Sequence, residues 1–71
     1  MTNKDKLEEY IEKSGYKKSF IAKQIGITRY ALILKINNKS EFKATEIEIL
    51  CTLLNIGVEE RMAIFFAKRV D

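Results

Sequence analysis

Apolar residues recur along this chain at spacings of three and four positions, which is the period of an amphipathic α-helix. Five segments show that spacing, over residues 3–14, 18–25, 28–36, 44–54 and about 58–68. The fourth is the most regular, with Ile47, Leu50, Cys51 and Leu54 forming one buried stripe. No segment carries a convincing strand pattern. The sequence therefore predicts a compact all-α fold of five helices.

The second and third predicted helices are joined by a very short connection. Gly26 can take the positive φ that a sharp corner between helices requires, and the Thr28 hydroxyl can cap the helix that follows. Ala22, four residues before Gly26, leaves room where two helices cross steeply. Residues 17–39 thus have the pattern of a helix-turn-helix, the unit that places its second helix in the DNA major groove.

The chain resembles the Cro/phage-repressor type of helix-turn-helix domain, within the lambda-repressor-like family. The resemblance rests on Ile21-Ala22, Ile25-Gly26-Ile27-Thr28-Arg29, Leu32, Asn37-Asn38-Lys39 and, more weakly, residues 47–56. It implies a five-helix DNA-binding domain over residues 1–71, with the motif at helices two and three. Lys17 replaces the usual Ser or Thr cap, and Lys35 stands where the family's reading helix usually has an apolar core residue.

Composition narrows the class of protein. Seventy-one residues make one domain. No apolar run approaches the roughly 20 residues of a membrane span, and the charged start lacks the apolar core of a signal peptide, so we expect a cytoplasmic protein. With no histidine, one cysteine and no evident carboxylate pair or nucleophile–base set, we expect no metal, no cofactor and no enzymatic activity.

The charge is unevenly distributed, although the net charge is only +3. Residues 13–40 contain seven basic side chains and no acidic one, whereas residues 41–71 contain four basic and six acidic ones. Positive charge thus gathers on the segment with the helix-turn-helix pattern, which favours nucleic acid as the partner.

In a docked helix-turn-helix, side chains at the start and on one face of the second helix reach the bases. That rule assigns base reading to Thr28, Arg29, Tyr30 and Ile33. Arg29 can present two donors to guanine O6 and N7. The alternative for Arg29 is an exposed arginine without a role, and for Tyr30 and Ile33 it is core packing.

Contacts to the DNA backbone are expected at the two ends of the motif. The residues assigned to phosphate are Lys17, Lys18 and Ser19 at the start of the second helix, and Asn37, Asn38 and Lys39 after the third. For the two asparagines a role in ending the helix is equally compatible with the sequence.

The fifth predicted helix is apolar around its circumference. Its candidate interface residues are Met62, Ile64, Phe65 and Phe66. The excess apolar surface can cover the core of one protomer, or it can form a homodimer interface. Because operator-binding domains of this size bind palindromic sites as two-fold dimers, we favour the dimer.

Several functions remain open from the sequence. The favoured one is a sequence-specific regulator of transcription that binds a double-stranded operator, such as a phage or prophage Cro-like repressor. The runner-up is a protein-interaction module, for example an antirepressor that binds another phage regulator. RNA binding is less favoured because few aromatic side chains lie within the basic segment.

Overall fold

The computed structural model describes residues 1–66, and within that range it contains five α-helices and no strand. The helices are α1 (Lys4–Ser14), α2 (Lys18–Ile25), α3 (Arg29–Ile36), α4 (Ala44–Leu54) and α5 (Val58–Phe65). The all-α prediction is confirmed, and the first four helices lie where the sequence places them. The predicted fifth helix is too long, because Phe66 already has non-helical backbone angles (φ −123°, ψ 33°). The rest of that prediction, residues 67–68, lies outside the described residues.

Local chemistry explains where the helices begin. The Asn3 side chain accepts a hydrogen bond from the Lys6 amide at 3.2 Å and caps α1. At the start of α4 a side chain within the helix accepts from the backbone of the N-cap residue: the Lys43 amide donates to Glu46 Oε1 at 2.8 Å. The start of α2, at Lys17, has no side-chain cap within residues 1–66.

All five helices contribute to one hydrophobic core. Its buried side chains are Leu7, Ile11, Ile21, Ala22, Ile25, Leu32, Ile36, Ile47, Leu50, Cys51, Leu54, Ile56, Ile64 and Phe65. The helical stripe predicted for α4 accounts for four of these residues, and it packs against both α1 and α2. Helix α4 thus packs against α1 and α2, while α3 packs mainly on α2 and α5 on α1.

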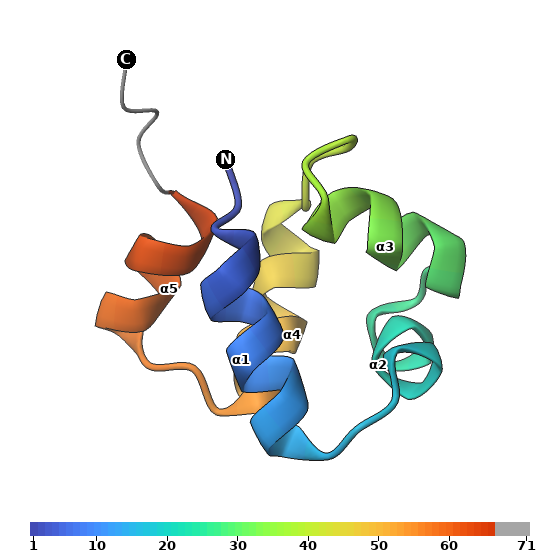
Figure 1. Ribbon diagram of the computed structural model, residues 1–71, viewed down its shortest axis with the longest axis horizontal. Helices are drawn as coiled ribbons and strands as arrows, with labels where there is room; N and C mark the ends of the chain where they lie inside the picture. The colour runs from blue at the N-terminus through green and yellow to red at the C-terminus, as the bar shows by residue number, and fades with distance from the viewer. Residues whose placement is uncertain (67–71) are drawn as a thin grey trace.

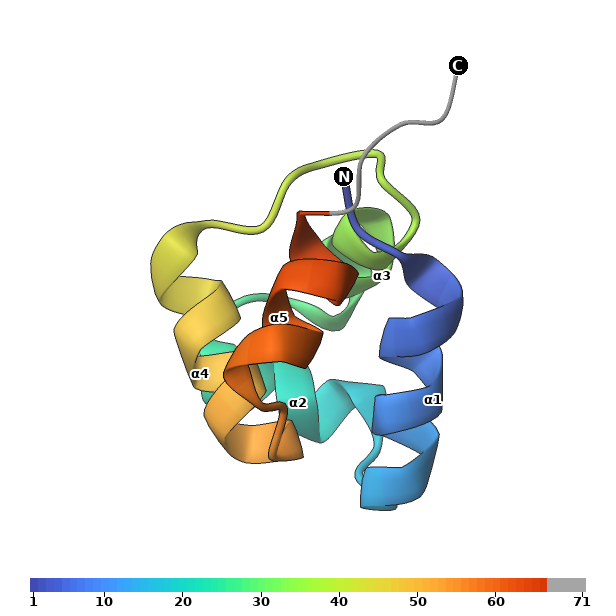
Figure 2. The ribbon, with the colours of Figure 1, turned by 90° about the vertical axis from the view of Figure 1, so that its left-hand side faces the viewer.

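Figure 1 shows how the helices are distributed along the molecule, whose principal extents are 34 × 24 × 21 Å. Helices α1 and α4 occupy the middle, α2 and α3 form one end of the long axis, and α5 lies at the other. Figure 2, viewed from the α5 end, shows α5 in front of α3. Helices α3 and α5 thus lie toward opposite ends of the molecule.

None of the helices within residues 1–66 has the length and apolar character needed to cross a membrane.

Candidate nucleic-acid interface

Gly26 forms the corner between α2 and α3. It has φ +91°, and its amide donates to the Ala22 carbonyl at 2.9 Å. The Ile27 amide bonds the same carbonyl at 3.0 Å, so the end of α2 is closed before the chain turns. The side chain of Ala22 is buried at this crossing. Each of these features follows from the residue type that the sequence places there.

The N-terminal turn of α3 is held by Thr28. Its Oγ1 accepts a hydrogen bond from the Ala31 amide at 3.0 Å. The hydroxyl that was assigned to base reading is thus engaged as an N-cap, while its methyl group remains on the exposed side chain. Thr28 therefore holds the backbone of the first turn of α3, from which Arg29 and Tyr30 extend.

The rotation of α3 decides which side chains face solvent. Leu32, Lys35 and Ile36 point inward, at the i, i+3 and i+4 positions of one buried stripe. On the outer side Arg29 is exposed, and Tyr30 is 71% exposed. This rules out the core-packing alternative for Tyr30. Ile33 is half-buried at the rim of the outer face.

A buried ion pair underlies this rotation. Lys35 Nζ lies 2.6 Å from Glu46 Oε1 and 3.2 Å from the Glu41 carbonyl oxygen. Burial by itself raises the pKa of Glu46, but hydrogen bonds from Lys35 and the Lys43 amide outweigh it, so the pKa lies below its ordinary value. One ammonium group thus joins α3, the following loop and the first turn of α4.

Two of the four predicted base-reading residues, Arg29 and Ile33, border a shallow hollow between three helices, whereas Thr28 and Tyr30 lie outside it. Its lining comprises Lys4 and Glu8 of α1, Lys18 of α2, and Arg29, Ile33, Ile36 and Asn37 at α3. The structure thus brings Arg29, Ile33, Lys18 and Asn37 together at one hollow, and the other residues assigned to DNA contact do not line it. Lys4 and Glu8 were not predicted as part of this surface, since they lie before the basic segment.

The three residues assigned to phosphate at the start of α2 are not equivalent. Lys17 and Ser19 are exposed. Lys18 is half-buried, and its ammonium pairs with Glu8 Oε2 at 3.1 Å. Only the first two are therefore presented to solvent without an ionic partner within residues 1–66.

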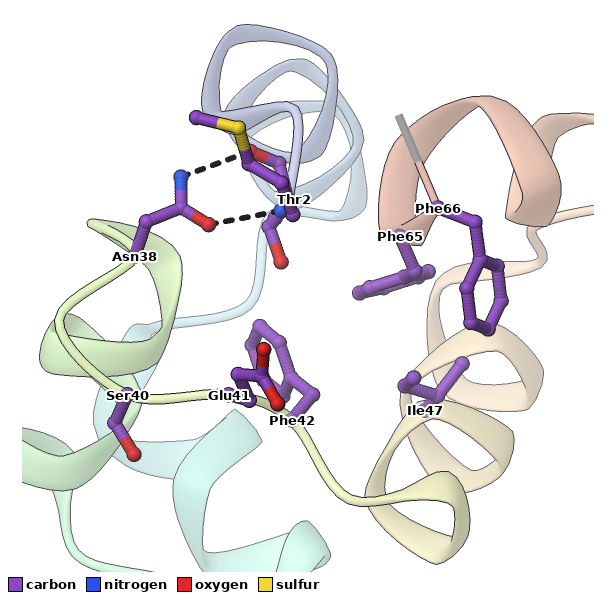
Figure 3. Close-up of a pocket in the computed structure, with 9 residues that line it drawn as sticks. Thr2, Asn38, Ser40, Glu41, Phe42, Ile47, Phe65 and Phe66 are labelled. Atoms are coloured by element: carbon purple, nitrogen blue, oxygen red, sulfur yellow. Dashed lines mark hydrogen bonds between the residues drawn. The ribbon is translucent and has the colours of Figure 1, made fainter. Parts of the chain in front are cut away.

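The asparagines after α3 both make internal hydrogen bonds. Asn37 Nδ2 donates to the Ile33 carbonyl at 3.0 Å. Asn38, with φ +62°, accepts from the Thr2 amide at 2.8 Å and donates to the Thr2 carbonyl at 2.9 Å, as Figure 3 shows. Both side-chain amides are thus engaged within the protein, that of Asn37 at the end of α3 and that of Asn38 with the first residues of the chain. Lys39 remains exposed beside them.

The packing of α5 corrects the predicted dimer interface at two of its four positions. Ile64 is fully buried and Phe65 is 4% exposed, its ring meeting that of Phe42 edge-on at 5.5 Å. Met62 and Phe66 remain 57% and 54% exposed. Val58, which is not among the predicted interface residues, is also exposed, so the three form an exposed apolar stripe spaced by four residues that runs from the start of α5 to its C-cap, Phe66.

Figure 3 shows the region between this end of α5 and the loop after α3. A pocket there has Thr2 and Asn38 on one side and Ile47, Phe65 and Phe66 on the other. The Asn3 amide also donates to the Ile64 carbonyl at 2.6 Å. The first residues of the chain thus connect α5 with the turn that follows α3.

Among residues 1–66, no three Asp, Glu or Cys side chains lie together as metal ligands do. Comparison of the chain with models of protein families, with curated proteins and with solved structures finds no match.

Proposed function

We propose that this protein is a sequence-specific, non-enzymatic transcription regulator that binds double-stranded DNA in the cytoplasm, as a phage Cro-like repressor does. The observation that carries the proposal is the outer face of α3. Its capped N-terminus projects Arg29 and Tyr30 into solvent, at one end of the molecule and within a segment that contains no acid. This is the part of a helix-turn-helix that enters the major groove.

Base reading is assigned to the first turns of α3. The Arg29 guanidinium can donate to O6 and N7 of one guanine, and such a pair supplies about 1–3 kcal/mol of discrimination against other bases. Tyr30 can contact a thymine methyl group or a phosphate. Ile33 lies at the rim of the same face and offers only an apolar contact, which suits a thymine methyl.

Backbone binding is assigned to exposed groups around that face. Lys17 and Ser19 flank the uncapped start of α2, where free amide groups favour an anion. Lys39 stands at the far end of α3. These contacts supply affinity and register without reading sequence, so binding weakens steeply with salt.

The exposed stripe on α5 supports a homodimer on a palindromic operator. Val58, Met62 and Phe66 lie at the opposite end of the long axis from α2 and α3 (Figure 1). A two-fold contact through this stripe leaves both copies of α3 free for two half-sites.

The experiment that tests base reading compares Arg29→Ala, Arg29→Lys and Lys39→Ala on a set of duplex sequences. Arg29→Ala relaxes preference at one base pair in each half-site. Arg29→Lys keeps the positive charge but loses the two parallel donors. It should therefore retain more of the binding affinity than of the sequence preference. Lys39→Ala weakens binding to all sequences alike. Unchanged sequence preference in Arg29→Ala removes α3 as the reader.

A second candidate is a protein-interaction module that binds another regulator. It is favoured by the exposed apolar stripe on α5, which a DNA-binding monomer does not need. This candidate predicts that substitutions at Met62 abolish activity while Arg29→Ala has no effect. The DNA-binding proposal predicts instead that Arg29→Ala impairs activity, and that Met62 substitutions weaken operator binding only through loss of the dimer.

A further inference from the structure

The hollow beside α3 contains one acidic side chain among its described lining residues. Glu8 reaches it from α1, whereas Lys4, Lys18 and Arg29 supply positive charge. Residues 13–40 contain no acid, so Glu8 is brought to this surface by the packing of α1 and not by its neighbours in the sequence. An acid at this position opposes the approach of a phosphate.

The carboxylate of Glu8 is also engaged with a specific cation. Its Oε2 lies 3.1 Å from Lys18 Nζ, and the two side chains are 35% and 32% exposed. The bond spans ten residues and joins α1 to the first turn of α2. Because the pair remains reachable by solvent, its net strength is small and an anion can compete for the lysine.

Resting on the DNA-binding function proposed above, we propose that Glu8 is an affinity-setting residue that competes with DNA phosphate for Lys18. In the free protein Glu8 holds the Lys18 ammonium, and a phosphate that docks at the start of α2 must displace the carboxylate or share the cation with it. The arrangement lowers phosphate-driven affinity, which is the term that dominates binding to non-operator DNA. Glu8 thereby sets the overall affinity for DNA, while sequence preference stays with the outer face of α3.

The test measures binding of a random-sequence duplex of about 30 base pairs, three helical turns, as a function of salt. Glu8→Gln is expected to tighten binding about two- to fivefold, as release of an exposed ion pair allows. The logarithm of affinity should fall with salt more steeply, by close to one unit of slope. The charge-matched control is Glu9→Gln, which changes an exposed acid on α1 outside the hollow.

The role of Lys18 is isolated by a double-mutant cycle. Lys18→Met should weaken binding more in the Glu8→Gln background than in the wild type, because only there is the ammonium unpaired before DNA arrives. If the ion pair has only a structural role, Glu8→Gln should weaken DNA binding instead of tightening it, because loss of the pair would loosen α2. Thermal unfolding of each variant, recorded alongside, confirms that the chains compared are folded.

Equal affinities for Glu8→Gln and Glu9→Gln, or an equal cost of Lys18→Met in both backgrounds, would overturn the role of Glu8 while leaving DNA binding intact. Failure of the wild-type protein to bind the duplex at low salt would overturn the proposed function as well.

Discussion

The ammonium of Lys35 lies 2.6 Å from the carboxylate of Glu46, with both side chains only 9% exposed. Lys35 can face the core because the carboxylate of Glu46 on α4 compensates its charge. The Glu41 carbonyl adds a further acceptor at 3.2 Å. The pair lies on the inner side of α3 together with the buried Leu32 and Ile36, and in that rotation Arg29 and Tyr30 are exposed.

Removing one member of this pair should destabilise the protein strongly. Lys35→Met leaves the Glu46 carboxylate buried without its counter-charge, at a cost of about 3 kcal/mol in the free energy of unfolding. Lys35→Met/Glu46→Gln should recover part of that loss, because the glutamine is neutral and can still accept from the Lys43 amide. Urea unfolding measures both variants. A Lys35→Met variant as stable as the wild type would show that the pair does not stabilise the fold.

The same pair predicts a specific loss of stability in acid. The pKa of Glu46 lies below its ordinary value of 4.5, despite the raising effect of burial. A carboxyl whose pKa is lowered by folding stabilises the protein above its unfolded-state value, and that contribution disappears as pH falls through the folded value. Wild-type unfolding free energy should therefore decrease below about pH 5. Lys35→Met/Glu46→Gln should show a smaller decrease over the same range, and an identical acid profile would exclude Glu46 as the cause.

The helices could be predicted from the sequence because their boundaries are local. Gly26 and Thr28 end one helix and start the next through contacts within four residues of the chain. The stripe on α4 needs only its own spacing. Such signals can be recognised without knowing which helices pack together.

The candidate site was less predictable because it depends on contacts between distant residues. Lys35 looked like a break in the apolar face of α3, since its partner Glu46 is eleven residues away. Glu8 carried no sequence signal for joining a basic surface. In α5, an apolar run around the whole circumference cannot indicate that Phe65 turns inward and Phe66 outward.

The exposed stripe on α5 should control self-association without controlling folding. Met62→Lys places a charge in the proposed dimer contact and should shift the protein toward monomer, while its unfolding temperature stays close to that of the wild type. Ile64→Lys, two residues away, should instead prevent folding because Ile64 is fully buried. Sedimentation over a range of concentrations reports the first effect. A wild-type protein that stays monomeric at every concentration would refute the dimer.

Cys51 should be unreactive in the folded protein. Burial raises the pKa of its thiol, even though the neighbouring Arg61 acts in the opposite direction, and the side chain is 2% exposed. Since the thiolate is the reactive form, alkylation by iodoacetamide should be slow in buffer and fast in urea. Cys51→Ala controls for labelling elsewhere. Rapid alkylation under native conditions would show that the α4 core opens readily.

Sequence reading by α3 can be tested by selection with the purified protein from a random duplex pool at near-physiological salt, followed by sequencing. A dimer that reads DNA through α3 should enrich an inverted repeat whose half-sites lie about one helical turn apart. An enriched single half-site would keep base reading and remove the dimer. A pool that remains random, with only weak and salt-sensitive retention, would contradict the claim and leave the protein-interaction function in its place.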